Sequence, residues 1–364
     1  MPVWHARTEK LVEEGKLHTL GIVEEQHPDR AVLFMQWQKM DWPVLADPFN
    51  RLGVKVVPIT LLLDSSGIIR YRNPSGKDLE TFLATRYPQT RVKDLDHSFD
   101  PSLEARQKEV KKMPSSPIAH FQLGVALRQR HDSENQESDD FAAAVASWQK
   151  ALELQPDQYI WRRRIQQYGP RLDKPYSFYD WVNTARAELK KAGEIPHPLT
   201  AEPGGSEFAY PEKDGVAGAV AKHPDPEGKV PLDGENFVSA SSVVVPSTKG
   251  DGGAIRVHLR FKPAAKGNIH WTNDAGNVSF HLEVEGGLVI HDFQGPGEPP
   301  QVPASAEERK IEFELRPAKG EKLPAKIKGT AYYYVCEGEE GVCRFLRQPV
   351  VFQNRSQESR TKGQ

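Results

Sequence analysis

The residues best suited to chemistry are two cysteines toward the C-terminal end of the chain. Cys336 and Cys343 are the only cysteines among 364 residues, and six residues separate them. Such a local pair can form one disulfide, serve as a redox-active dithiol, or remain two ordinary thiols. Two cysteines do not supply the disulfide framework of a small secreted domain. Any thiol chemistry of this chain must therefore take place at Cys336 and Cys343.

The two cysteines flank a predicted hairpin turn. Residues 329–336 favour a strand, residues 337–341 are acidic and rich in glycine, and a second strand follows. Positions that face each other across a hairpin can come within disulfide distance. Closing so small a ring would restrict the unfolded chain by roughly 2.5 kcal/mol. Geometry alone leaves a structural bridge and a redox-active pair both open.

Charged neighbours of the pair have opposing effects on the pKa of a thiol. A carboxylate raises this pKa and a guanidinium lowers it. The acids in question are Glu337, Glu339 and Glu340, and the base is Arg344.

The hairpin resembles a known redox domain. Three tyrosines, Tyr332, Tyr333 and Tyr334, precede the first cysteine, and a Gly-Val-Cys sequence follows the turn. These features are similar to the N-terminal immunoglobulin-like domain of the periplasmic disulfide reductase DsbD, although the cysteine spacing differs slightly. Similar tails follow thioredoxin domains in other multidomain bacterial proteins. The resemblance implies that Cys336 and Cys343 exchange electrons with a thioredoxin-like partner through a mixed disulfide.

Residues 231–353 around this hairpin predict an antiparallel β-sandwich, immunoglobulin-like by the same resemblance. About seven short strands alternate with turn residues, which is typical of this class. The domain carries four histidines without the i,i+4 or C-x-x-C spacing of strong metal motifs. We therefore expect surface or edge positions, not a metal or cofactor site, for His258, His270, His281 and His291.

Residues 1–90 predict an α/β domain with the element order α-β-α-β-β-α. The sequence of residues 42–69 resembles the thioredoxin-like redoxins of the TlpA and AhpC/TSA group. The resemblance implies that Val57-Pro58 is the cis-proline site, which offers backbone groups to an extended substrate chain. A cis peptide bond before proline is a minority state, so it would have a structural reason.

This domain lacks the catalytic cysteines that the family requires, because no thiol precedes residue 336. Either Met1 and Trp4 occupy the register of the C-x-x-C motif, or the motif belonged to a segment upstream. A truncated or misassigned start would explain the gap, and a true pseudo-redoxin is the alternative. The missing first strand would also leave the sheet open at one side.

Residues 114–192 predict a helical bundle. Leu123-Gly124 in one segment, and Ala144, Trp148 and Ala151 in the next, match the small and aromatic positions of a tetratricopeptide repeat. We expect a spacer that packs against its neighbours; a groove for a peptide or protein ligand is the alternative. The division of the chain is completed by two linkers, at residues 91–113 and 193–230, and by a polar tail at residues 354–364.

Composition limits the classes of function. A net charge of −2 gives no electrostatic case for nucleic acid, and no apolar run is long enough to span a bilayer. The first residues show no signal peptide, whereas the resemblances imply a periplasmic or otherwise extracytoplasmic location. The expected fold is thus a multidomain α/β, α and β chain.

Two functions remain open. The first is a redoxin-like, thiol–disulfide redox protein of cell redox homeostasis, in which Cys336 and Cys343 carry the exchange. Its partner would be a thioredoxin-like protein or the chain's own thioredoxin-like domain. The second is a non-catalytic interaction scaffold with a structural disulfide. Enzymatic activity is left open, because the domain that resembles a catalyst has no nucleophile.

Overall fold

The computed structural model describes residues 1–89, 98–171, 178–208, 223–248, 253–283, 288–318, 321–338 and 341–354. Contacts between Cα atoms divide the chain into two compact units, which we describe separately. Unit 1 comprises Met1–Ser133, Ala146–Arg163 and Val182–Ala201. Unit 2 comprises Glu134–Val145, Arg164–Trp181 and Glu202–Gln364. The predicted helical region contributes to both units.

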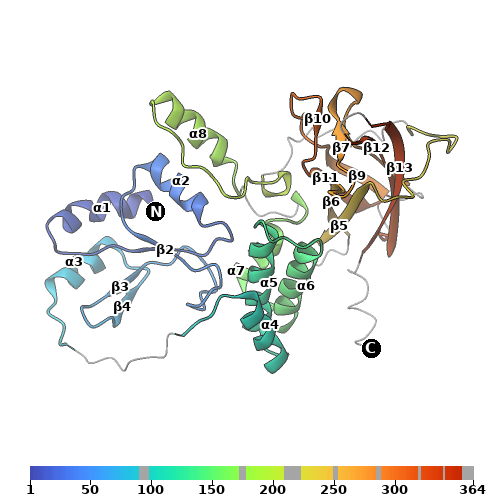
Figure 1. Ribbon diagram of the computed structural model, residues 1–364. Coiled ribbons are helices and arrows are strands. Elements are labelled where there is room, and N and C mark those ends of the chain that lie inside the picture. The colour runs from blue at the N-terminus through green and yellow to red at the C-terminus, as the bar shows by residue number, and fades with distance from the viewer. Residues whose placement is uncertain are drawn as a thin grey trace. The chain divides into compact units, whose positions relative to one another are not determined.

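Unit 1 begins with the predicted α/β region. Its elements are α1 (Pro2–Glu13), β1 (Gly21–Val23), α2 (Asp29–Gln38), β2 (Val44–Ala46), β3 (Leu61–Leu63), β4 (Ile69–Arg72) and α3 (Gly76–Ala84) (Figure 1). The short strand β2 lies where the sequence predicts a loop, and it pairs in parallel with β1. Gly21 permits this close pairing, because a Cβ atom there would lie 3.0 Å from Val44 Cγ2.

The strands of unit 1 do not form the single open sheet that the sequence predicts. Within residues 1–89, β1 pairs only with β2, and β3 pairs only with β4. The predicted β3–β4 hairpin is present, and its turn is held by Asp64, which accepts hydrogen bonds from Ser66 N and Ile68 N at 2.9 and 3.1 Å. A small core of Leu62, Leu79 and Phe82 lies beneath it.

Five further helices follow: α4 (Leu103–Lys112), α5 (Pro117–His131), α6 (Asp140–Leu154), α7 (Tyr159–Gln166) and α8 (Trp181–Lys191). Ser116 caps α5, and Pro117 occupies its first turn, where a missing N–H costs nothing. The predicted small positions Ala144 and Ala151 are fully buried, as is Trp148. The helices are thus confirmed, whereas the tetratricopeptide assignment stays a prediction.

Unit 2 contains the predicted antiparallel β-structure. Its strands are β5 (Val238–Pro246), β6 (Ile255–Pro263), β7 (Ile269–Thr272), β8 (Ser279–Glu283), β9 (Leu288–Gln294), β10 (Ala304–Ser305), β11 (Arg309–Pro317), β12 (Lys326–Glu337) and β13 (Cys343–Gln353). One sheet has the order β5-β6-β11-β9. The other has the order β10-β7-β12-β13, with β8 also paired to β12.

The two sheets of unit 2 share one core. Phe313 of β11 stacks on Phe280 of β8 with 5.7 Å between ring centroids, and it contacts Phe352 of β13 at 6.0 Å. Trp271 and Tyr333 are fully buried in the same cluster. Antiparallel sheets that pack face to face are confirmed by these contacts, while the immunoglobulin-like topology stays a prediction.

The outer face of β6 and β11 carries a buried cluster of charges. Arg256 Nη2 lies 3.0 Å from Glu312 Oε2, and His258 Nδ1 lies 3.3 Å from Glu312 Oε1. His258 Nε2 is 2.8 Å from the carbonyl oxygen of Tyr168, at the end of the α7 segment. Glu314 accepts a hydrogen bond from the backbone N–H of Arg171 at 2.8 Å. This cluster fastens the segment after α7 to the β-sheet.

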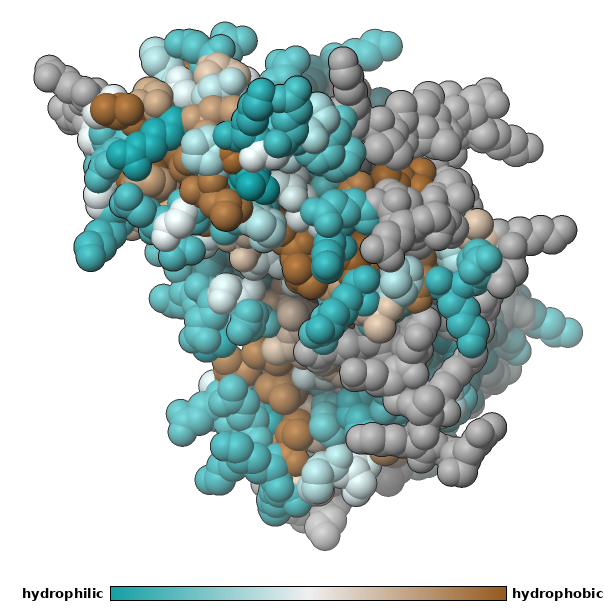
Figure 2. All heavy atoms as spheres, turned by 90° about the vertical axis from the view of Figure 1, so that its right-hand side faces the viewer, coloured by the Kyte–Doolittle hydropathy of each residue, from teal (hydrophilic) through white to brown (hydrophobic). Residues whose placement is uncertain are grey.

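On the face shown in Figure 2, hydrophobic residues appear as separate patches between hydrophilic ones. Among the described residues, no helix combines the length and apolar character needed to cross a bilayer.

Candidate functional site

The cysteines form a disulfide across the β12–β13 hairpin. The register of the two strands places Cys336 directly opposite Cys343. The sulfur atoms are 1.93 Å apart, and the Cα atoms are 4.0 Å apart. Gly341 is required at the turn, because a Cβ atom there would collide with the carbonyl group of Glu337. The predicted hairpin and the approach of its two cysteines are therefore confirmed.

The disulfide lies on the outer face of its sheet. Along β12, Ala331, Tyr333 and Val335 point into the core. Because side chains alternate along a strand, Cys336 points to the opposite face. The two cysteines differ in access to solvent, because Cys336 is only 6% exposed whereas Cys343 is exposed. An incoming group therefore reaches the disulfide from the side of Cys343.

Aromatic side chains border the disulfide on the same face. Tyr334 and Phe345 are the next two opposite residues on the face that carries the disulfide, and their rings stack with 4.4 Å between centroids. Tyr333 points the other way, as alternation predicts, and its hydroxyl donates to Asp233 Oδ2 at 2.8 Å. Burial raises the pKa of Tyr333 well above its usual value, and the hydrogen bond to Asp233 adds to this shift.

The effect of Arg344 and Glu337 on the pKa of the thiols stays a prediction, and strand register shows where the two side chains lie. Both residues are neighbours of the cysteines in sequence, so alternation sends their side chains to the other face of the sheet. There Arg344 lies 3.9 Å from both Glu337 and Glu235, and its guanidinium covers the ring of Phe237. Glu339 and Glu340 lie outside the described residues.

His270 is the titratable side chain that the strand register places beside the pair. Strand β12 pairs with β13 along one edge and with β7 along the other, and in β7 His270 is directly opposite Cys336. Its neighbour Trp271 points into the core, so His270 shares the outer face with the disulfide. The sequence predicts a surface or edge position for His270 and gives no sign of its place beside the cysteines. The pairing of β7 with β12 spans more than sixty residues, and no local signal in the sequence reveals it.

The other histidines are dispersed. His258 belongs to the buried charge cluster. The ring of His281 in β8 is tilted against the ring of His223, with 4.2 Å between their centroids. The side chain of His291 lies outside the described part of the chain. In that part, no three His, Cys, Asp or Glu residues group so that they could hold a metal ion.

The cis peptide bond predicted at Val57-Pro58 is present. Both residues are exposed, and the loop before them is fixed by neighbours within unit 1. Asn50 Nδ2 donates to the carbonyl oxygen of Val54 at 2.8 Å, and Lys55 forms a 2.6 Å ion pair with Asp157. Val57 and Pro58 belong to unit 1, whereas both cysteines belong to unit 2.

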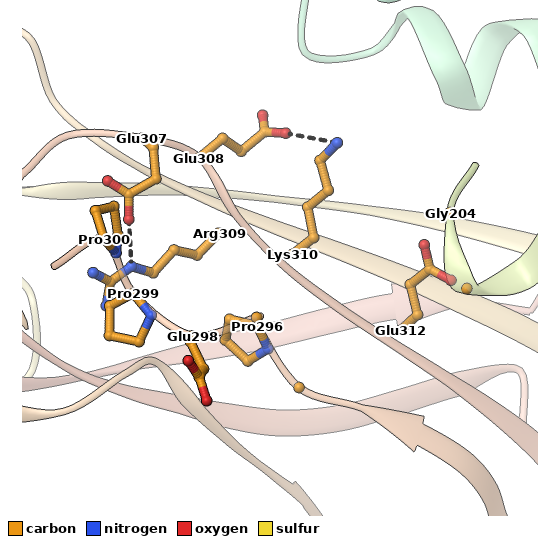
Figure 3. Close-up of a pocket in the computed structure, with 13 residues that line it drawn as sticks. Gly204, Pro296, Glu298, Pro299, Pro300, Glu307, Glu308, Arg309, Lys310 and Glu312 are labelled. Atoms are coloured by element: carbon orange, nitrogen blue, oxygen red, sulfur yellow. Dashed lines mark hydrogen bonds and ion pairs between the residues drawn. The ribbon is translucent and has the colours of Figure 1, made fainter. Parts of the chain in front are cut away.

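Unit 2 also contains an open cavity of about 480 Å³ on a proline-rich loop. Its lining includes Pro296, Pro299 and Pro300 together with charged residues of the β11 region, and Figure 3 shows Pro299 and Pro300 next to Glu307 and Arg309. Glu307 pairs with Arg309 at 3.0 Å, and Glu308 lies 3.8 Å from Lys310.

Comparisons with known proteins give weak and partial matches. No protein-family model matches the chain, and no curated protein does. Among solved structures, the GAE domain of GGA2p from Saccharomyces cerevisiae is 15% identical, with 33% of this chain and 90% of that chain covered and a TM-score of 0.23. The reduced N-terminal domain of DsbD from Neisseria meningitidis is 14% identical, with 28% and 86% covered and a TM-score of 0.18. A FixG-related protein from Vibrio parahaemolyticus is 6% identical, with 32% and 95% covered and a TM-score of 0.16.

Proposed function

We propose that this protein is a thiol–disulfide redox protein and that Cys336 and Cys343 exchange with the thiols of a thioredoxin-like partner. The cross-strand disulfide, which is open to solvent on the side of Cys343, carries this proposal.

The difference in exposure gives the exchange a direction. A thiolate of the partner attacks Cys343 Sγ, a new S–S bond forms, and the bond to Cys336 breaks with its electron pair on Cys336 Sγ. A second thiolate of the partner then attacks the partner's sulfur in this mixed disulfide and releases Cys343. The partner dithiol is oxidised by two electrons, and the pair is reduced to two thiols.

The partner must supply both thiols, because this chain has no cysteine besides the pair. The chain's own thioredoxin-like region cannot complete the exchange by itself. Within the proposal, the exposed backbone at Val57-Pro58 binds an extended segment of a protein substrate and does not take part in the electron transfer.

The redox potential of the pair tests this function. Titration of the intact protein against glutathione should give a midpoint within the range of exchange proteins, roughly −180 to −270 mV. A thioredoxin-like dithiol should reduce the disulfide, and Cys343→Ser should abolish the mixed disulfide. A midpoint well below about −300 mV, together with resistance to thioredoxin, would assign the pair to a structural bridge.

A specific observation also favours the interaction scaffold as the second function. Ile22 and Leu45 face each other across β1 and β2, and they are 44% and 56% exposed. Exposed apolar side chains gathered on a sheet are a feature of interaction surfaces. In that case Leu45→Lys, and not Cys343→Ser, would abolish binding to a partner protein.

A further inference from the structure

We propose that His270 is the proton partner of Cys336 during thiol exchange. This inference rests on the proposed function, since it assigns a role in the same reaction. It concerns a residue on a different strand, sixty-six positions away from Cys336 in the sequence.

The register of three strands aligns the groups involved. β7 pairs with β12 so that His270 is opposite Cys336, and β12 pairs with β13 so that Cys336 is opposite Cys343. Directly opposite residues in an antiparallel sheet have Cβ atoms about 4.5–5.5 Å apart. An imidazole extends far enough to cover this separation. His270, Cys336 and Cys343 thus form one row across the outer face.

A hydrogen bond determines which nitrogen of His270 can exchange a proton with sulfur. Nδ1 lies 3.1 Å from the carbonyl oxygen of Asn268. A carbonyl oxygen only accepts, so Nδ1 must carry hydrogen and Nε2 is left to exchange a proton. The same oxygen accepts a 3.2 Å hydrogen bond from Gly338 N, just beyond Cys336. The imidazole is therefore tied to the turn that joins the two cysteines.

Other charged groups near the hairpin end are less suitable. Arg344, Glu337 and Glu235 form their ion pairs on the opposite face of the sheet. A proton acceptor on the outer face, beside the less exposed cysteine, is the arrangement that a thiol and imidazole pair requires.

This placement accounts for the proton both in the reduced pair and during reduction of the disulfide. In the reduced pair, Nε2 accepts the S–H proton of Cys336, which leaves a thiolate beside an imidazolium. When a partner thiolate attacks Cys343, the electron pair of the broken S–S bond goes to Cys336 Sγ. An imidazolium that has taken its proton from solvent donates that proton from Nε2 to the new thiolate.

The test compares three variants of the full chain in reduction by dithiothreitol. His270→Ala and His270→Gln remove the proton partner, and the second keeps a hydrogen-bonding side chain in case the first impairs folding. His281→Ala is the matched control, because His281 is opposite Thr330, on the same face of β12 but six residues from Cys336. We expect both His270 variants to exchange about tenfold more slowly at neutral pH, and the control to match the wild type.

A second measurement separates a proton partner from a structural residue. In a Cys343→Ser background, the thiolate absorbance of Cys336 is followed against pH. Loss of His270 should reduce the thiolate fraction at neutral pH about tenfold, because no imidazolium balances the charge. Equal titrations with and without His270 would overturn the inference. If instead the wild-type disulfide itself resists a thioredoxin-like dithiol, the proposed function fails before His270 is tested.

Discussion

The two units complete their β-structure in different ways. In unit 2, two extensive antiparallel sheets cover one shared core, and Phe313 connects strands of both. In unit 1, four short strands form two separate pairs, and Leu61 and Leu63 of β3 remain 37% and 49% exposed. Two sheets that pack face to face bury one side of every strand between them, whereas a two-stranded pair leaves more of its apolar surface exposed. The β-structure of unit 2 therefore supplies its own core, and that of unit 1 does so only in small part.

Glu312→Gln should have the largest effect and should act on unit 2. The substitution removes the carboxylate that pairs with His258 and one of the two carboxylates that pair with Arg256, which is fully buried. Breaking a buried ion pair by removing one partner costs about 3–5 kcal/mol. Denaturant unfolding should show this loss in unit 2 alone. Glu298→Gln, at an exposed position, is the control. A parallel loss in unit 1 would show that the effect is not confined to the unit that contains Glu312.

Lowering the pH should reduce the stability of unit 2 in the wild type in the same way as Glu312→Gln. Burial by itself would raise the pKa of Glu312, but the charges of His258 and Arg256 lower it far below its usual value. A depressed folded pKa adds stability above the unfolded pKa of about 4.3, and this stability disappears as the pH falls further. The denaturation midpoint of unit 2 should therefore fall steadily below about pH 4.3. Glu312→Gln should remove this contribution, so a wild-type slope that persists unchanged in the variant would assign it to other carboxyls.

Cys343→Ser should have an intermediate effect. Loss of the short ring relaxes the unfolded chain, which corresponds to roughly 2.5 kcal/mol on the loop-entropy estimate. Dithiothreitol should produce the same decrease in the wild type and none in the variant. A much smaller decrease, with exchange retained in the wild type, would show that the disulfide is kept for its chemistry.

Ser75→Ala should have the smallest effect and should act on unit 1. Ser75 Oγ accepts from the N–H of Asp78 at 3.2 Å, and Asp78 Oδ2 accepts from the N–H of Ser75 at 2.7 Å. Losing such a cap costs about 1 kcal/mol. Thermal unfolding of unit 1 should register it, with Ser65→Ala as the exposed control. If the melting of unit 2 shifted equally, local capping would not explain the stability of unit 1.

The sequence predicts features that depend on neighbouring residues. The cysteine hairpin and the helices follow from local patterns, and the cis bond before Pro58 follows from the family resemblance. Strand register does not follow in this way. Nothing in residues 269–272 indicates pairing with β12, so the place of His270 beside Cys336 was not predicted. The same applies to the ion pair between Arg344 and Glu235, which joins residues far apart in the sequence.

The link between His258 and the carbonyl of Tyr168 has a consequence for modularity. A fragment that starts at residue 231 would leave Arg256, His258 and the carboxylates of β11 without the backbone groups that cover them. A helical fragment cut at residue 192 would likewise lose its attachment to the sheet. Shuffling of gene segments at the apparent linkers would thus separate residues that fold together. A gene segment that preserves the β-domain of this chain must therefore also encode the helical residues around Tyr168.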